Sequence, residues 1–442
     1  MTFDPSRLTA SHAARRLRDG TLSAEAMARA CLDRVSARDP IVRAWAHTDP
    51  ALVLAQAREL DRRGWSGPLH GLPLGVKDII LTCDMPTQYN SPLYRGFRPE
   101  LDASCVTLLR AAGAIIFGKT DTVEFAASGR LALSRNPNDP ERTPGGSSSG
   151  SAVAVADFHV PLALATQTGG STIRPASFCG IHAMKPSWNL VSLEGVRRYA
   201  VSLDTLGWYG RSSADLALLY DVFDPEPAVS QPIEIRGARI AICHSPVWPQ
   251  ASVATRQAMV DAEATLREAG AEISILDLPP SFDRLVELQR LVMRAEGRTA
   301  FLAEYRTRYD LLHQSFRDHV ENADGVTRSD LVRAYDVAAA CRAEFDRLAS
   351  GFDAVLTPST VDVAPVGLNN TGDYVFNGMW SLLHVPCINL PYFRGENGLP
   401  LGLTLTGPRF SDRRVLGVAA AMDHVFARSC NTAEHGCGDA PA

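Results

Sequence analysis

The sequence predicts an α/β fold, because short apolar runs alternate with helical patterns along much of the chain. The alternation is densest between Gly67 and Gly210, as in proteins whose strands and helices follow each other around one sheet. The same alternation recurs as a predicted β-α-β unit, with strands at residues 239–243 and 271–276 and a helix at residues 253–270. Residues 353–358 form one more strand pattern that enters a loop. These regions predict a sheet that extends well beyond residue 210.

Composition places the 442-residue chain among globular proteins and excludes several other classes. Hydrophobic residues make up 45% and charged residues 21%, which is typical of a soluble domain. The net charge of −5 gives no electrostatic reason to expect binding to nucleic acid or to an anionic membrane. The N-terminal residues lack an apolar signal segment, and no apolar run reaches the roughly 18 residues of a membrane span. Nine cysteines without a repeated spacing predict reduced thiols and a cytoplasmic location.

The two flanking parts of the chain have helical patterns of their own. Residues 1–65 are predicted to be helical, with Thr9 and Ser23 as N-caps and Pro50 at the start of a third helix. This segment either wraps the core or makes an oligomer contact, so a homodimer is possible. Residues 280–350 are helical, charged and rich in arginine. We expect them to form a cap that selects the substrate.

The C-terminal residues have two possible interpretations. Cys430, His435 and Cys437 could in principle bind a metal. The glycine-containing end favours disorder instead, so we expect residues 431–442 to form a disordered tail without a metal site.

The central feature of the sequence is a pair of Gly-Gly-Ser steps between residues 143 and 186. Ser147 and Ser171 end these steps and lie 171 − 147 = 24 residues apart, and the run between them is almost entirely small or apolar. Glycine lets backbone come close to a bound molecule, and free N–H groups at the start of a helical turn can hold an oxyanion. The pattern therefore indicates nucleophilic serine chemistry, although two ordinary turns with serine caps would look the same.

Lysine usage suggests a base for such a serine. Lysine and arginine together number 44, but only Lys77, Lys119 and Lys185 are lysines. An amine can lose its proton in a protein, whereas a guanidinium cannot. Lys77 is the best candidate because it ends an apolar, strand-like run in which desolvation would lower its pKa.

Two motifs match other enzyme classes in letters but not in context. Gly113–Thr120 matches the P-loop pattern, but a helical pattern precedes it and its variable residues look like a strand. Gly146–Gly150 matches the G-x-S-x-G elbow with Ser148 as nucleophile, but a polar loop stands where the elbow needs a hydrophobic strand. We therefore expect neither nucleotide binding nor an α/β-hydrolase.

Five motifs in this order and spacing resemble the amidase signature family of serine hydrolases, and the similarity covers most of the chain. They are residues 71–78 (GLPLGVKD), 118–120 (GKT), 143–151 (TPGGSSSGS), 169–180 (GGSTIRPASFCG) and 185–187 (KPS). The resemblance implies a single domain over residues 1–442, with a large mixed, twisted sheet covered by helices on both faces. Residues 67–210 would form the catalytic core and residues 211–430 a sheet extension that includes the cap.

The resemblance also implies the roles of individual residues. Ser171 would be the acylated nucleophile, Ser147 the bridging serine on a cis peptide bond, and Lys77 the general base. The backbone N–H groups of Thr168, Gly169, Gly170 and Ser171 would form the oxyanion hole. We further assign substrate contacts to Ala126, Ser148 and Trp380, and note Tyr374 as a second candidate pocket aromatic.

Two residues depart from the family's commonest pattern. Ser149 stands in place of a glycine and Gln167 in place of an aspartate. The Gln variant is similar to a subgroup acting on small amides, ureas and biuret-like compounds, which argues against a role in a tRNA-linked amidotransferase.

The predicted function is hydrolysis of the C–N bond of a small amide through an acyl-enzyme, without a metal or organic cofactor. A carbamate (urethane), a biuret or a ureido acid presents the same carbonyl attached to nitrogen, and an esterase side activity would use the same residues. A catalytically silent scaffold subunit is the alternative from a different class.

Overall fold

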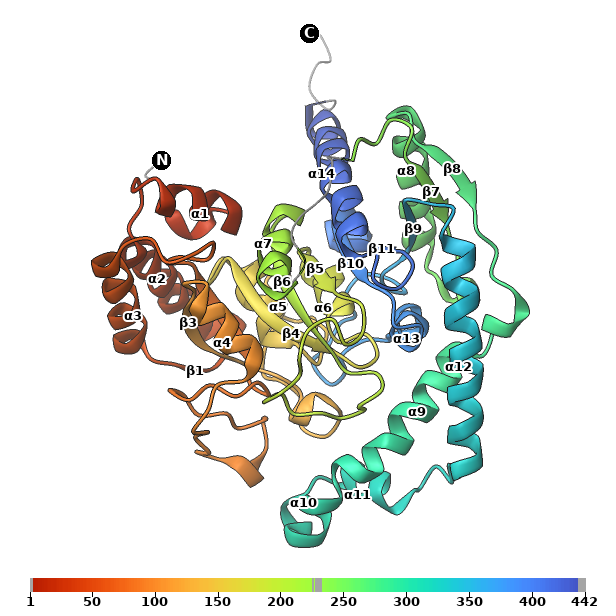
Figure 1. The fold of residues 1–442 in the computed structure, drawn as a ribbon, viewed down its shortest axis with the longest axis horizontal. Coiled ribbons are helices and arrows are strands. Elements are labelled where there is room, and N and C mark those ends of the chain that lie inside the picture. The colour runs from red at the N-terminus through yellow and green to blue at the C-terminus, as the bar shows by residue number, and fades with distance from the viewer. Residues whose placement is uncertain (1–2, 225, 227–232, 436–442) are drawn as a thin grey trace.

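The computed structural model describes residues 3–224, 226 and 233–435, and the strands of these residues form one mixed sheet of eleven strands (Figure 1). Strands β3, β2 and β4 run parallel, as do β9, β7 and β8, and the other neighbours are antiparallel. The predicted α/β fold with a large mixed sheet is confirmed. In sheet order the strands are β1 (Trp45–Thr48), β3 (Ile115–Thr120), β2 (Pro73–Lys77), β4 (Leu162–Gln167), β6 (Thr205–Gly210), β5 (His182–Lys185), β10 (Cys387–Arg394), β11 (Pro400–Thr406), β9 (Ala354–Pro358), β7 (Arg239–Ile242) and β8 (Glu272–Ile275).

Helices cover both faces of this sheet. Helices α5 (Ser149–Ala156) and α6 (Ile173–Cys179) contact each other and the central strands. On the opposite face α7 (Ser213–Phe223) contacts both α4 (Ser104–Ala111) and α14 (Asp412–His435) (Figure 1). Helix α8 (Val253–Glu268) joins β7 to β8, and α13 (Val375–Leu382) precedes β10. No helix of the described residues combines the length and the apolar character needed to cross a bilayer.

The N-terminal segment contains the predicted helices and one strand that was not predicted. Helices α1 (Ala10–Arg18), α2 (Ala24–Val42) and α3 (Pro50–Arg63) lie at one end of the sheet (Figure 1). The Thr9 and Ser23 hydroxyls cap α1 and α2 as expected. Strand β1, however, lies between α2 and α3 and pairs antiparallel with β3. The expectation of a purely helical segment is therefore wrong at these four residues, which are too few for a periodic pattern.

Residues 280–350 form the expected group of helices at the other end of the molecule (Figure 1). Phe301 and Phe316 of this group pack against Phe125 of the core, with ring centroids 5.3–5.5 Å apart. Aromatic contacts therefore join the cap to the core, together with polar contacts such as the ion pair between Arg197 and Glu304 at 2.9 Å. Its helices are α9 (Leu285–Ala300), α10 (Leu302–Thr307), α11 (Gln314–Glu321) and α12 (Arg328–Ala349).

The C-terminal prediction needs one correction. Helix α14 continues to His435, so residues 431–435 are helical rather than part of a disordered tail. Residues 436–442, including Cys437, lie outside the described residues.

Both misleading motifs are explained by the fold. Gly118, Lys119 and Thr120 belong to strand β3, and the buried Lys119 amine donates to the Ile80 carbonyl oxygen at 2.5 Å and to the Thr87 hydroxyl at 2.6 Å. This amine cannot reach a phosphate. Ser148 is fully buried, so it cannot serve as an exposed nucleophile on an elbow.

Trp208 tests the packing of β6 against α7. Its side chain is fully buried, its indole N–H donates to the Leu216 carbonyl oxygen at 3.1 Å, and its ring lies 5.4 Å from that of Phe223. We expect Trp208→Ala to lower the free energy of unfolding by about 3–5 kcal/mol, measured by chemical denaturation. Leu101→Ala, at a side chain that is 75% exposed, should change it by less than about 0.5 kcal/mol. Equal stability of the two variants would contradict the described packing.

Candidate active site

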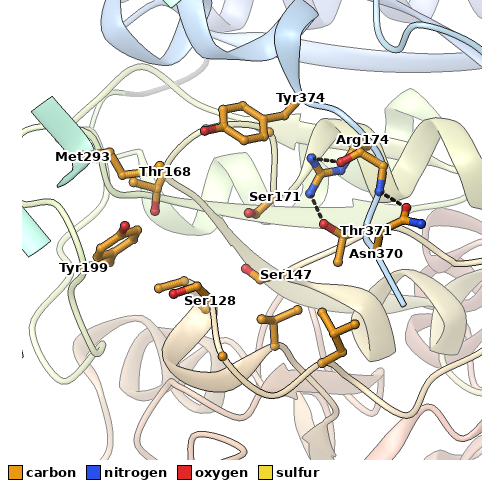
Figure 2. A pocket seen from close by; sticks show the side chains of 18 residues that line it. Ser128, Ser147, Thr168, Ser171, Arg174, Tyr199, Met293, Asn370, Thr371 and Tyr374 are labelled. Atoms are coloured by element: carbon orange, nitrogen blue, oxygen red, sulfur yellow. Dashed lines mark hydrogen bonds between the residues drawn. The ribbon is translucent and has the colours of Figure 1, made fainter. Parts of the chain in front are cut away.

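A cavity of about 370 Å³ lies where the turn after β4 meets the loop before α13 (Figure 2). Thr168, Gly169, Gly170 and Ser171 form one wall, and Ser147 lies beside them. The remaining lining comes from residues 123–131, from residues 370–374, and from the single residues Arg174, Tyr199 and Met293. The cavity therefore joins parts of the chain that are far apart in sequence.

Lys77 lies behind this cavity as the last residue of β2, and its side chain is fully buried. Its amine contacts three hydroxyl oxygens, those of Ser147 at 2.8 Å, Ser148 at 2.9 Å and Thr166 at 2.9 Å. Burial lowers the pKa of Lys77 well below its usual value, and the negative charge of Asp204 opposes this only in part. The surroundings thus favour the neutral amine that a base requires.

Ser147 connects Lys77 with the cavity. Its hydroxyl contacts the Lys77 amine and also lines the cavity, on whose wall Ser171 lies (Figure 2). The peptide bond between Gly146 and Ser147 is cis. The Ser147 carbonyl oxygen accepts a hydrogen bond from the Thr122 hydroxyl at 2.9 Å, which holds the turn in place.

Ser171 follows a turn that leaves backbone donors available. In the part of the chain that the structure describes, the N–H groups of Gly169, Gly170 and Ser171 donate to no protein acceptor. A side chain at either glycine would collide with its neighbours: a Cβ on Gly169 would lie 2.8 Å from the Tyr374 ring and one on Gly170 would lie 2.4 Å from Asn377. Glycine is therefore required for this close approach, and the free N–H groups can hold an oxyanion.

Asp204 fixes the start of this turn. Its carboxylate accepts hydrogen bonds from the Thr168 hydroxyl at 2.6 Å and from the backbone N–H groups of Tyr199 and Ala200. Burial raises the pKa of Asp204 to about 6, and these hydrogen bonds oppose the rise. The Thr168 carbonyl oxygen also accepts from the Gln289 side-chain amide at 3.0 Å. Hydrogen bonds thus fix both the side chain and the carbonyl group of Thr168.

Gln167 fixes the turn of residues 168–171 through both the oxygen and the nitrogen of its side-chain amide. Its oxygen accepts from the backbone N–H groups of Thr172 at 2.9 Å and Ile173 at 3.1 Å. Its nitrogen donates to the Ser381 hydroxyl at 3.1 Å, and that hydroxyl donates to the Gly169 carbonyl oxygen at 2.7 Å. An ionised aspartate or glutamate could make the first set of contacts but could not donate to Ser381. The departure from the commonest motif therefore has a structural purpose.

The other departure, Ser149, has a simpler explanation. Its hydroxyl donates to the Gly145 carbonyl oxygen at 2.7 Å at the start of α5. It stabilises the first Gly-Gly-Ser step and does not line the cavity.

Of the predicted substrate contacts, the structure places only Ala126 in the cavity lining. Ser148 lies outside it, because its hydroxyl accepts from Lys77 and donates to the Thr166 carbonyl oxygen at 3.2 Å. Trp380 is 1% exposed and packs against Phe345 at 5.3 Å between ring centroids. The structure therefore places neither Ser148 nor Trp380 in the lining of this cavity. Tyr374, the second aromatic candidate, does line the cavity.

Several lining residues were not predicted. Arg174, Tyr199, Met293, Asn370 and Thr371 all border the cavity (Figure 2). Most come from segments without a motif, so nothing in the sequence singles them out. Arg174 is different, because it is a charged residue inside the small and apolar run from residue 171 to 180. A charged residue within a run of small and apolar residues indicates a functional role, so the sequence did contain a signal for Arg174.

The geometry can support one kind of chemistry. A buried amine with a lowered pKa, a serine hydroxyl in contact with it, a second serine on the wall of the same cavity, and free backbone N–H groups are the parts of a serine hydrolase site in which lysine takes the place of histidine.

Known proteins with this fold agree with that class. The sequence pattern of the family described as Amidase matches residues 26–416. A glutamyl-tRNA(Gln) amidotransferase subunit from Chloroflexus aggregans is 34% identical over 95% of this chain and 96% of its own. A crystal structure of an amidase has a TM-score of 0.86 at 30% identity, covering 94% of this chain and 99% of its own. The chain therefore belongs to the amidase family.

The fold is also similar to that of a third protein, whose description concerns s-triazine catabolism. A structure described as a vestigial protein complex that reveals the evolutionary origins of an s-triazine catabolic enzyme has a TM-score of 0.85 at 26% identity. It covers 94% of this chain and 98% of its own.

Asp204→Asn tests the electrostatics around Lys77. The rate at which a sulfonyl fluoride labels Ser171 should fall with decreasing pH, because Lys77 gains a proton and can no longer act as a base. Asp204 raises the pKa of Lys77, so its neutralisation should move this fall to lower pH. Asp261→Asn, at an exposed site, should leave the profile unchanged. A fall at the same or a higher pH in Asp204→Asn would contradict the electrostatic coupling.

Gln167→Glu tests whether the side-chain amide of Gln167 positions the turn of residues 168–171. The glutamate keeps the acceptor for Thr172 and Ile173 but cannot donate to Ser381, and its charge opposes an oxyanion nearby. We expect the labelling rate of Ser171 to fall by up to about 10²-fold, the lower end of the effect of losing an oxyanion donor. Gln56→Glu, which alters a partly buried amide bonded to Ile116 and remote from the cavity, should affect stability alone. An unchanged rate in Gln167→Glu would show that the amide does not position the turn.

Proposed function

We propose that the protein hydrolyses the C–N bond of a small amide through Ser171. The observation that carries the proposal is the contact between the buried Lys77 amine and the Ser147 hydroxyl, 2.8 Å long, at a cavity that Ser171 also lines. Neutral Lys77 takes a proton from Ser147 while Ser147 takes one from Ser171, and the Ser171 oxygen attacks the carbonyl carbon. The N–H groups of residues 169–171 stabilise the negative charge on the carbonyl oxygen.

The second half of the reaction uses the same residues. The proton held at Lys77 passes through Ser147 to the leaving nitrogen as the C–N bond breaks, which leaves an acyl ester on Ser171. Water then attacks this ester, gives its proton to the relay, and releases a carboxylic acid and free Ser171. Protonation of the leaving nitrogen is what extends such a site from esters to amides.

Two features support a small substrate. A cavity of about 370 Å³ lies at the low end of the range of ligand sites. The Gln167 motif and the similarity to a structure connected with s-triazine catabolism favour a carbamate, biuret or ureido compound as the second candidate. A catalytically silent scaffold subunit is the alternative, and the only support for it is that the relative from Chloroflexus aggregans is named as a subunit.

We also propose a cytoplasmic location. The seven cysteines for which the structure describes a state are all free thiols, which suits a reducing compartment. A homodimer remains part of the proposal and is checked by the mass of the protein in solution.

Ser171→Ala tests the function directly. Wild type and variant are offered a primary amide, an acyl nitroanilide, a nitrophenyl carbamate and biuret, with release of ammonia or chromophore as the readout. We expect one class to be turned over and the variant to lose this activity by at least about 10³-fold. Ser350→Ala, at an exposed cap residue, serves as the control.

Two outcomes would contradict the proposal. Equal turnover by wild type and Ser171→Ala would remove Ser171 from the mechanism. Failure of a sulfonyl fluoride to label Ser171 in the wild type, together with no turnover, would favour the scaffold role.

A further inference from the structure

A second cavity, of about 740 Å³, lies where the core meets the cap. Its core side is formed by Trp188 and by residues between 196 and 202. Among the described residues, Tyr199 alone lines both this cavity and the catalytic one. Tyr199 therefore lies at the boundary between the two spaces. On the cap side the second cavity is lined by Glu296, Thr299, Ala300 and Tyr335.

The second cavity offers apolar surface to a ligand, because its buried charges already have partners. Arg198 is exposed to solvent, and Arg197 contacts the Glu304 carboxylate at 2.9 Å. Glu296 accepts hydrogen bonds from both the backbone N–H and the hydroxyl of Ser202. A space of this kind suits an alkyl or aromatic group. The apolar and aromatic lining includes Trp188, Val196, Val201 and Ala300.

The side chain of Tyr199 is held at this boundary by the cap. Its hydroxyl contacts Nε2 of His319 in α11 at 2.7 Å, and the two rings are stacked with centroids 5.8 Å apart. The ring also lies 5.6 Å from that of Phe301. Helix α9 has a glycine at the point of contact, where a Cβ on Gly297 would lie 2.6 Å from the Tyr199 ring. Glycine is unfavourable inside a helix, so its presence here fits a need for space beside the ring.

The contact between Tyr199 and His319 joins two uncharged groups. Burial raises the pKa of the Tyr199 phenol above its usual value and lowers the pKa of His319. At neutral pH the phenol therefore keeps its proton and can donate it to a neutral imidazole. A neutral hydrogen bond thus keeps the ring in its place.

Tyr199 lies at the end of the catalytic cavity away from Arg174. Figure 2 shows it near Met293, with Ser171 between this end and Arg174. The backbone N–H of Tyr199 donates to the Asp204 carboxylate at 2.7 Å, so a change of side chain leaves this contact intact. A substrate group that extends from Ser171 towards this end meets the Tyr199 ring.

We propose that Tyr199, held by His319, limits the size of the substrate by closing the catalytic cavity against the second one. The inference rests on the proposed function and names the size class of its substrate, which is an amide that fits within about 370 Å³. Removal of the ring would join the two cavities. The enzyme would then accept amides with an alkyl or phenyl group long enough to reach the second cavity.

Packing of the cap is the competing role for Tyr199. Loss of its contacts could loosen the cap and change the reaction of Ser171 with every compound. Two reagents of different size separate these roles. Misplacement of Ser171 slows both reagents, whereas an opened boundary favours the larger one.

The experiment measures the rates at which methanesulfonyl fluoride and octanesulfonyl fluoride label Ser171. Because the leaving fluoride is small, the alkyl group can extend from Ser171 in either direction along the cavity. We expect Tyr199→Ala to raise the ratio of the octyl rate to the methyl rate by at least about 10-fold, the smallest effect of one methylene group in a hydrophobic pocket. An unchanged ratio in Tyr199→Ala would overturn the proposal.

Two variants test the part played by His319. His319→Ala removes the hydrogen bond but keeps the Tyr199 ring, so the ratio should rise by only about 2–10-fold, the effect of one neutral hydrogen bond. His319→Gln offers an amide oxygen to the phenol and should return the ratio towards that of the wild type. An unchanged ratio in His319→Ala would exclude His319 as the residue that holds the ring.

Phe345→Leu is the control for a loosened cap. Phe345 is fully buried in α12 and packs against Trp380 at 5.3 Å, away from Tyr199. This variant should lower stability and leave the size ratio unchanged. A rise as large as that in Tyr199→Ala would overturn the proposal, because loosening of the cap alone would then admit the larger reagent.

The two proposals fail in different ways. Labelling of wild-type Ser171 by methanesulfonyl fluoride, with a size ratio that Tyr199→Ala does not change, would overturn the size limit alone. Absence of labelling by either reagent in the wild type would instead remove the hydrolase function on which the size limit rests.

Discussion

The site depends on a lysine that is buried without an acidic partner in contact. The Lys77 amine lies at the end of a fully buried strand, and its three contacts are hydroxyl groups. A carboxylate in contact would hold the amine in its charged form, whereas hydroxyls bond to either form without adding charge. The sheet must therefore supply a dry position, and the turns around Ser147 and Thr166 must supply the polar contacts.

The turn that carries Ser171 is held by a network of neutral groups and one carboxylate. Gln167 and Ser381 act on one side of it, and Asp204 and Gln289 act on Thr168 at its start. Because Asp204, Gln289 and Ser381 come from three other segments of the chain, these hydrogen bonds fix the backbone donors before any ligand arrives. Preorganisation of this kind is how an enzyme stabilises charge without reorganising during the reaction.

The sequence alone predicted the parts of the fold and site that have a local signature. The β-α-β unit over β7, α8 and β8 has a clear period, and Lys77 stands in an apolar run that ends in a charge. Strand β1 was missed because four residues between two helices carry too little pattern, and its strand character comes from pairing with β3. The packing of Trp380 against Phe345 could not be predicted, because in the sequence an aromatic residue looks the same whether it faces the cavity or the core. Asn370 and Tyr199 reach the cavity only through long-range packing.

The cavity wall is built from two kinds of segment. Lys77 ends strand β2, Ser171 lies in the turn after β4 and Ser147 lies just before α5, whereas Met293 comes from cap helix α9 and Tyr374 from the loop before α13. Mutations at Met293 can therefore reshape the cavity, whereas Gln289 of the same cap helix also holds the turn of Ser171 through the Thr168 carbonyl oxygen. One helix of the cap thus has two roles, since Met293 shapes the space open to a ligand while Gln289, one turn away, steadies the backbone beside Ser171.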